Sequence, residues 1–147
     1  MDDETYNAQK ARIQKLIDRW VEPLGLNWWE LSFRYVRVPG EKLDGGWQCI
    51  AETSVQWQYL HAIITFWMPV VVDEDDDELE ESFVHELTHV LVQEMRETAS
   101  DQSDEQKHVE RVVETLSRAF RWVRKAGYDE GVQSSSHNTL RDEAVIS

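Results

Sequence analysis

The first part of the chain places its apolar residues at the spacing of a helix. Apolar side chains recur every three or four positions, at Ile13, Leu16, Ile17, Trp20 and Val21. This period lines one face of an α-helix and predicts an amphipathic helix over residues 5–21. Pro23 and Gly25 follow shortly afterwards, and both residue types favour the end of a helix.

Three segments between residues 27 and 72 carry strand patterns. "NWWELSFRYVRV" alternates, and it places on one face Trp29, Leu31, Phe33 and Tyr35. After the turn-rich "PGEKLDGG", a second strand is expected in "WQCIAETSVQWQ" and a third in "YLHAIITFWMPVVV". The third is nearly continuously apolar from Ala62 to Met68, which predicts a strand buried on both faces.

Two further helices are expected in the second half of the chain. The run "DEDDDELEE" at 73–81 favours a solvated lead whose negative charge suits the positive end of a helix dipole. Periodic apolar residues then predict a helix over 78–97 and another over 104–125, ended by Gly127. The polar, aperiodic stretch 127–147 is expected to be a flexible tail.

The order of elements is therefore helix, three strands, helix, helix. This order predicts an α+β fold in one domain over residues 1–126, with a short, mostly antiparallel sheet packed against the helices. A chain of 147 residues suits one domain with a core of its own.

The net charge and the single cysteine argue against several kinds of partner and site. A net charge of −14 disfavours nucleic acid and anionic membranes as partners, because both would be repelled. Cys49 is the only cysteine, so an internal disulfide and a multi-cysteine zinc site are excluded. The acidic start and the lack of a run of about 20 apolar residues predict a cytoplasmic protein without a membrane helix.

The segment "HELTH" carries the candidate chemistry. His85 and His89 stand four positions apart, so on a helix they share one face and can bind one metal ion. Glu86 points to a neighbouring sector, where it can reach a water without being a ligand. Burial of ionisable groups is costly unless they are paired or bind metal, and this favours a metal site within the apolar helix.

A third protein ligand is expected, because catalytic zinc usually has three and an open position for water. The last predicted helix offers four candidates: Glu105, His108, Glu110 and Glu114. Their positions around the helix do not decide among them. The metzincin pattern is excluded, because Val92 and Met95 stand where it requires glycine and histidine.

"HELTH" followed by "ERVVE" resembles the gluzincin arrangement, H-E-x-x-H and then E-x-x-x-D on a second helix, as in thermolysin-like peptidases. The resemblance implies that Glu110 is the third zinc ligand. It also implies that Glu114 hydrogen-bonds a zinc-binding histidine, although the pattern has aspartate there. Larger gluzincins add a later His or Tyr that holds the oxyanion; the candidates here are His61, Tyr59, His108 and Tyr128.

Residues 5–125 as a whole are similar to small metallopeptidase-like proteins of phages and prophages. The resemblance implies a minimal zincin fold, with a short twisted sheet over the active-site helix. It implies one Zn²⁺ per chain, Glu86 as general base and a peptide or protein substrate. By the same analogy, the strand at 61–68 is expected to be the sheet edge along which the peptide lies.

Two alternatives to an active hydrolase remain from the sequence. One is a zinc-binding phage module with a structural or regulatory role and no turnover, since a motif does not guarantee activity. The other is an acidic interaction module that binds a basic protein and needs no metal. The sequence does not indicate an oligomeric state.

Overall fold

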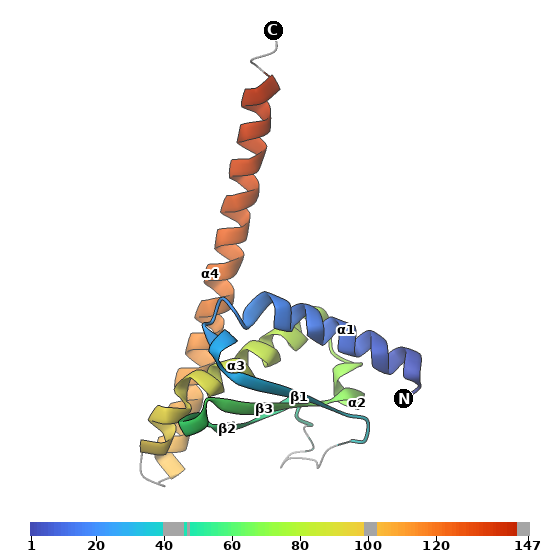
Figure 1. Ribbon diagram of the computed structural model, residues 1–147, viewed down its shortest axis with the longest axis vertical. Helices are drawn as coiled ribbons and strands as arrows, with labels where there is room; N and C mark the ends of the chain where they lie inside the picture. Colours follow the sequence, from blue (N-terminus) through green and yellow to red (C-terminus); the bar gives the residue numbers. More distant parts are fainter. Residues whose placement is uncertain (40–45, 47, 99–102, 144–147) are drawn as a thin grey trace.

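The computed structural model describes residues 1–39, 46, 48–98 and 103–143. The elements in chain order are helix α1 (Asp3–Trp20), the 3-10 turn η1 (Leu26–Trp28), strands β1 (Glu30–Val36) and β2 (Ala51–Gln56), the 3-10 turn η2 (Trp57–Tyr59), strand β3 (His61–Trp67), and helices α2 (Met68–Val71), α3 (Asp76–Thr98) and α4 (Ser103–Glu143). The fold is α+β (Figure 1), and the sequence prediction of this class is confirmed.

The sheet has the order β1-β3-β2, with β3 parallel to β1 and antiparallel to β2. The prediction of a mostly antiparallel sheet is therefore wrong, because one of its two strand pairs is parallel. β2 follows β1 in the chain but lies beyond β3 in the sheet, and β3, which follows the η2 turn, pairs with both. Because β3 is central, the prediction that residues 61–68 form the sheet edge is also wrong.

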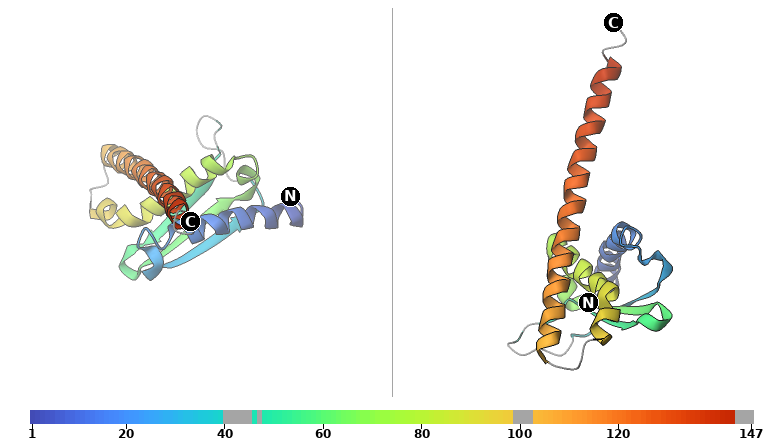
Figure 2. Two further views of the ribbon diagram at one scale, coloured as in Figure 1. Left: turned by 90° about the horizontal axis from the view of Figure 1, so that it is seen from above. Right: turned by 90° about the vertical axis from the view of Figure 1, so that its left-hand side faces the viewer.

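One face of the sheet carries the core, and α1 and α3 cover that face (Figures 1 and 2). The strand residues that face these helices include Leu31, Phe33, Tyr35, Ala51, Val55, Ala62, Ile64 and Phe66. The ring of Phe83 on α3 lies at their centre, 6.2 Å from Phe33 and 5.9 Å from Phe66 between centroids. Such distances are typical of packed aromatic pairs.

The burial predictions for β1 and β3 have different outcomes. The alternation of β1 is confirmed, because Trp29, Leu31, Phe33 and Tyr35 all pack against the core. The prediction that β3 is buried on both faces is wrong for one face, where Ile63, Thr65 and Trp67 are half-buried. Its apolar sequence fits a central strand with neighbours on both edges, rather than one with helices on both faces.

The acidic run leads into α3 through a capping box. The backbone N–H of Glu78 donates to the Asp75 side chain at 2.9 Å, and the Asp75 N–H donates back to Glu78 at 3.4 Å. Asp76, Asp77 and Glu78 occupy the first turn, where negative charge stabilises a helix. Arg12 of α1 holds this corner by binding Asp76 and the carbonyl of Glu74, each at 2.9 Å.

Helix α4 begins where the sequence places it but does not end there. It continues past Gly127 to Glu143, away from the body of the molecule (Figure 1), so the prediction of a helix end near residue 125 is wrong. A glycine inside a helix costs only about 1 kcal/mol relative to alanine, which is too little to stop a helix already anchored by packing. The separate prediction that 127–147 is a flexible tail stays a prediction.

Among the described residues, no helix combines the length and the apolar character that a membrane crossing requires.

The aromatic centre of the core gives the first testable prediction. Replacement of Phe83, which is fully buried, by alanine removes ring contacts with two strands and leaves a cavity. We expect Phe83→Ala to lower the free energy of unfolding by about 3–5 kcal/mol in urea titrations followed by circular dichroism. The control is Val123→Ala on the exposed surface of α4, which should change it by less than about 0.5 kcal/mol. Equal effects of the two variants would contradict this core.

Candidate metal centre

The candidate site lies between α3 and the first half of α4, which run side by side (Figures 1 and 2). Helix α4 is seated through Val113, which is fully buried, and through Phe120, which packs against the core. Arg121 adds polar contacts to α3, at 3.1 Å from the Glu81 carboxylate and 3.3 Å from the Asp77 carbonyl. This packing sets which residues of α4 face the histidines of α3.

Three of the predicted site residues converge across this helix pair. The Nε2 atoms of His85 and His89 are 3.1 Å apart, as their spacing of four on one helix predicts. The Glu110 carboxylate of α4 reaches both, at 3.6 Å from His85 Nε2 and 3.5 Å from His89 Nε2. All three donor atoms lie within 4.8 Å of one another, and within the described residues this is the group that could hold a metal ion.

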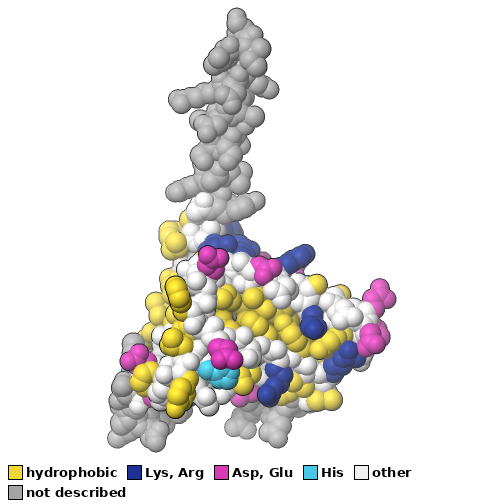
Figure 3. Space-filling model, in the orientation of Figure 1, with side chains coloured by type: hydrophobic (Ala, Val, Ile, Leu, Met, Phe, Trp, Pro, Cys, Tyr) yellow, Lys and Arg dark blue, Asp and Glu magenta, His cyan; other side chains and the backbone are white. Residues whose placement is uncertain are grey.

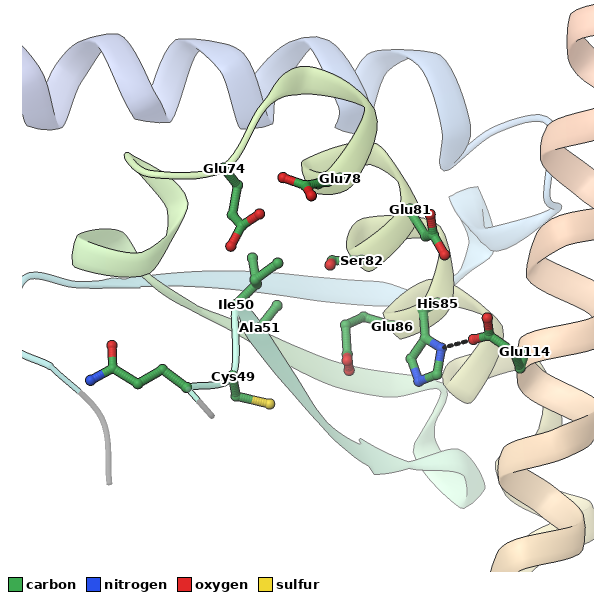
Figure 4. A pocket seen from close by; sticks show the side chains of 11 residues that line it. Cys49, Ile50, Ala51, Glu74, Glu78, Glu81, Ser82, His85, Glu86 and Glu114 are labelled. Carbon is green, nitrogen blue, oxygen red and sulfur yellow. Dashed lines mark hydrogen bonds and ion pairs between the residues drawn. The ribbon is translucent and has the colours of Figure 1, made fainter. Parts of the chain in front are cut away.

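Glu114 lies one helical turn after Glu110 and contacts the other side of the His85 ring. Its Oε2 atom is 3.2 Å from His85 Nδ1 (Figure 4), so Nδ1–H donates to the carboxylate in the tautomer that leaves Nε2 as an acceptor. Arg118 holds the second oxygen of the same carboxylate at 2.7 Å. The pair Arg118–Glu114 thus fixes the orientation of one imidazole.

Glu86 points from α3 toward the sheet, where the Thr53 hydroxyl of β2 donates a short hydrogen bond to its Oε2. Burial raises the pKa of Glu86 to about 7, against the lowering effects of the Thr53 hydrogen bond and of His85. The nearby carboxylates of Glu110 and Glu52 add to the rise. A carboxylate that exchanges its proton near neutral pH is suited to general acid–base chemistry.

His89 is less exposed than His85. Burial lowers the pKa of His89 below its ordinary value, although the Glu110 carboxylate opposes the shift. Its imidazole is therefore neutral at neutral pH and keeps a nitrogen lone pair. A neutral imidazole is the form that binds a metal ion.

A cavity of about 510 Å³ opens beside these residues (Figure 4). His85, Glu86 and Glu114 lie on one side of it, and the Cys49 and Ile50 segment before β2 lies on another. Its other described lining residues are Gln48, Ala51, Glu74, Glu78, Glu81 and Ser82. The candidate ligand His85 and the candidate base Glu86 therefore face a space that can receive a ligand.

The alternatives for the third ligand are placed elsewhere or are not described. His108 is exposed and does not join the group of donor atoms. The side chain of Glu105 lies outside the described part of the chain, as does that of Tyr128. Tyr59 is exposed, and neither it nor His61 lines the cavity.

Two residues of the site were missed from the sequence. Thr53 stands in an alternating strand pattern that shows which face it occupies, but not that it reaches Glu86. Arg118 follows Glu114 by four positions, which is a helix ion-pair spacing and a signal that was available.

No protein-family model, curated protein or solved structure matches this chain.

The buried Glu86 gives a prediction for the metal-free protein. Its pKa is about 7 when folded against an ordinary 4.5, so the folded state holds a proton that the unfolded chain has lost between these pH values. Stability from this group is therefore greatest below pH 4.5 and declines as the pH rises through 7. We expect chelator-treated Glu86→Gln to be more stable than wild type by about 1–3 kcal/mol at pH 8, with the difference vanishing toward pH 4.

Urea titrations of both proteins across this pH range measure the difference. The matched control is Glu22→Gln, an exposed glutamate that does not contribute to the Glu86 shift and whose removal should give no such trend. A stability difference between wild type and Glu86→Gln that stays constant with pH would contradict the shifted pKa.

Proposed function

We propose that this chain is a zinc-dependent peptidase in which Glu86 is the general base. The observation that carries the proposal is the convergence of His85, His89 and Glu110, with Glu86 beside them at a cavity. The convergence brings Glu110 of α4 to histidines of α3 that lie more than twenty positions earlier, which the spacing within α3 alone would not produce. The ligand roles are those that the gluzincin-like pattern implies.

The donor geometry supports zinc as the ion. Ligands about 2.0–2.1 Å from a tetrahedral zinc lie about 3.3–3.4 Å from one another. Here the two Nε2 atoms are 3.1 Å apart, and the two oxygens of Glu110 lie 3.6 Å from His85 Nε2 and 3.5 Å from His89 Nε2. With one donor atom taken from each residue, all separations are within 4.8 Å, so side-chain shifts of about 1 Å would bring the three to tetrahedral spacing. Two imidazole nitrogens and one carboxylate also suit zinc better than the harder cations, which prefer oxygen ligands alone.

In this proposal, bound zinc supplies a Lewis acid that polarises a carbonyl and increases the acidity of a water. The chain supplies the proton transfers. Glu86 accepts a proton from the attacking water and returns one to the leaving amine, and the Thr53 hydrogen bond holds its carboxylate in place. Glu114 keeps the His85 ring in the tautomer that presents Nε2.

The position of β2 suggests how a peptide would approach. β2 is an edge strand, it contacts α3, and its Thr53 binds the proposed base. An extended peptide that pairs with this edge would pass the cavity that His85 and Glu86 line. This placement replaces β3, which is the central strand and has no free edge.

A second candidate function is zinc binding without turnover. One observation favours it: among the described residues that line the cavity there is no Tyr, Lys or Arg, and the one His is the candidate ligand His85. Gln48, Ser82 and Cys49 are the other side-chain donors there. Stabilisation of a developing oxyanion by positioned donors is usually a large part of catalysis, and a site without a cationic or phenolic donor for the oxyanion would bind metal but react slowly.

The ligand roles predict a graded loss of zinc affinity. Glu110→Ala removes a direct ligand and should weaken Zn²⁺ binding by more than about 100-fold, whereas Glu114→Ala removes only a partner of His85 and should weaken it by about 10–100-fold. Competition with a chromophoric chelator measures both. The control His108→Ala, an exposed residue two positions before Glu110, should leave the affinity unchanged. A larger loss in His108→Ala than in Glu110→Ala would reassign the third ligand.

Glu86→Gln separates the two candidate functions. We expect the variant to retain about one zinc per chain, as wild type should, because Glu86 is not a ligand. Its cleavage of a mixed peptide library, followed by mass spectrometry, should fall by at least about 100-fold, because a general base is lost. Zinc-loaded wild type that cleaves nothing would favour the non-catalytic module, and the absence of bound zinc in both proteins would exclude both candidates.

A further inference from the structure

Positive charge gathers at the junction of α1 and α4, although acids outnumber bases by 29 to 15 in the chain. Two cavities, of about 930 and 450 Å³, meet at Arg19 in this junction. The basic residues that line them are Lys15, Arg19, Arg118, Arg121, Arg124 and Lys125. Figure 3 shows Lys and Arg side chains at the base of the grey part of α4. We name this region, defined by these six residues and Trp122, the basic cleft.

The basic cleft holds cations that the fold itself does not neutralise. Arg19, Arg118 and Arg121 form ion pairs with Glu80, Glu114 and Glu81. Within the described part of the chain, Lys15 and Lys125 form no ion pair, and Arg124 lies over the Trp20 ring at 5.2 Å instead of facing a carboxylate. In so acidic a chain, unpaired cations in a concave surface create a local positive potential that attracts an anion.

An exposed aromatic ring accompanies these charges. Trp122 is 70% exposed and lines the smaller cavity together with Arg121 and Lys125. Arg118, Trp122 and Lys125 are spaced by four and three positions, so they share one face of α4. Exposed tryptophan beside arginine is the composition of energetically important residues in protein interfaces.

The acidic residues of the region limit the kind of anion that fits. Asp18, Asp77 and Glu80 also line the two cavities, and Glu114 and Glu81 pair with Arg118 and Arg121, so six basic residues stand against five acidic ones and the region carries a small net positive charge. With a net charge of −14 on the whole chain, the surface outside the cleft is acidic on balance and disfavours a long polyphosphate. A short segment with a few carboxylates would meet the local positive charge alone.

We propose that the basic cleft binds a short acidic peptide segment of another protein. Carboxylates of the segment pair with Lys15, Arg124 and Lys125, and an apolar residue between them packs on the Trp122 ring. Arginine binds carboxylates in a bidentate geometry, and apolar contact with the indole adds to the charge attraction. Arg118 lies in both regions, but Lys15, Arg124 and Lys125 take no part in the candidate metal centre, so this proposal does not depend on zinc or on peptidase activity.

The test is fluorescence anisotropy of a labelled Glu-Glu-Leu-Glu-Glu peptide titrated with the full chain. We expect saturable binding that weakens as salt is added, and tighter binding than for a Lys-Lys-Leu-Lys-Lys peptide or a short oligothymidine. The double variant Lys15→Glu/Lys125→Glu should raise the Kd by at least about tenfold. The matched control, Arg34→Glu/Arg111→Glu, makes the same charge change at exposed arginines outside the cleft and should leave the Kd within about twofold.

A second variant tests the aromatic contact without changing the charge. Trp122→Ala should raise the Kd for the leucine-containing peptide more than for a peptide with glycine in place of leucine. Circular dichroism and thermal melts establish that each variant is folded. Equal weakening by the cleft and control double variants, tighter binding of oligothymidine than of the acidic peptide, or no saturable binding by the folded wild-type chain would each overturn the proposal.

Discussion

The seating of α4 on α3 determines whether this chain has a site at all. His85 and His89 are fixed by their own helix, but the carboxylate that completes the group belongs to another one. Glu110 is 54% exposed and contributes little to the packing that places it. That packing comes from Val113, one turn further along, which is fully buried. The donor geometry therefore depends on apolar contacts made by residues with no chemistry of their own.

Bringing these ionisable residues together is electrostatically unfavourable, and the effect is clearest at Glu86. Glu86 keeps a raised pKa because burial, where α3 packs on β2, removes its carboxylate from water, and the Glu110 carboxylate of α4 adds to the rise. Thr53 compensates in part through its hydrogen bond. Ionisable groups with shifted pKa values are common at functional sites. A bound cation would reduce the repulsion between the carboxylates of Glu86 and Glu110.

The fold class and the site residues of α3 could be predicted from the sequence, because both follow from short-range periodicity. Periodicity alone could not choose among the candidate ligands of the last helix, since the choice depends on how α4 is rotated and shifted against α3, and Glu110 was singled out only by the gluzincin resemblance. Local periodicity does not encode that register. The sheet order was missed for a similar reason: a long connection lets β2 lie on either side of β3, and alternation is the same in both. The predicted helix end near residue 125 was wrong because the cost of Gly127 inside a helix is smaller than the stability that packing gives to α4.

Helix α4 joins the two regions that the structure distinguishes. Its turns at Glu110 and Glu114 face the histidines, and its next turns, from Arg118 to Lys125, line the basic cleft. Arg118 belongs to both, because it lines the smaller cavity and also holds the carboxylate that orients His85. Carboxylates that drew Arg118 into the cleft would leave Glu114 with His85 as its remaining described side-chain partner. A long helix anchored over only part of its length thus places two chemically opposite sites, one rich in acids and one in bases, within consecutive turns.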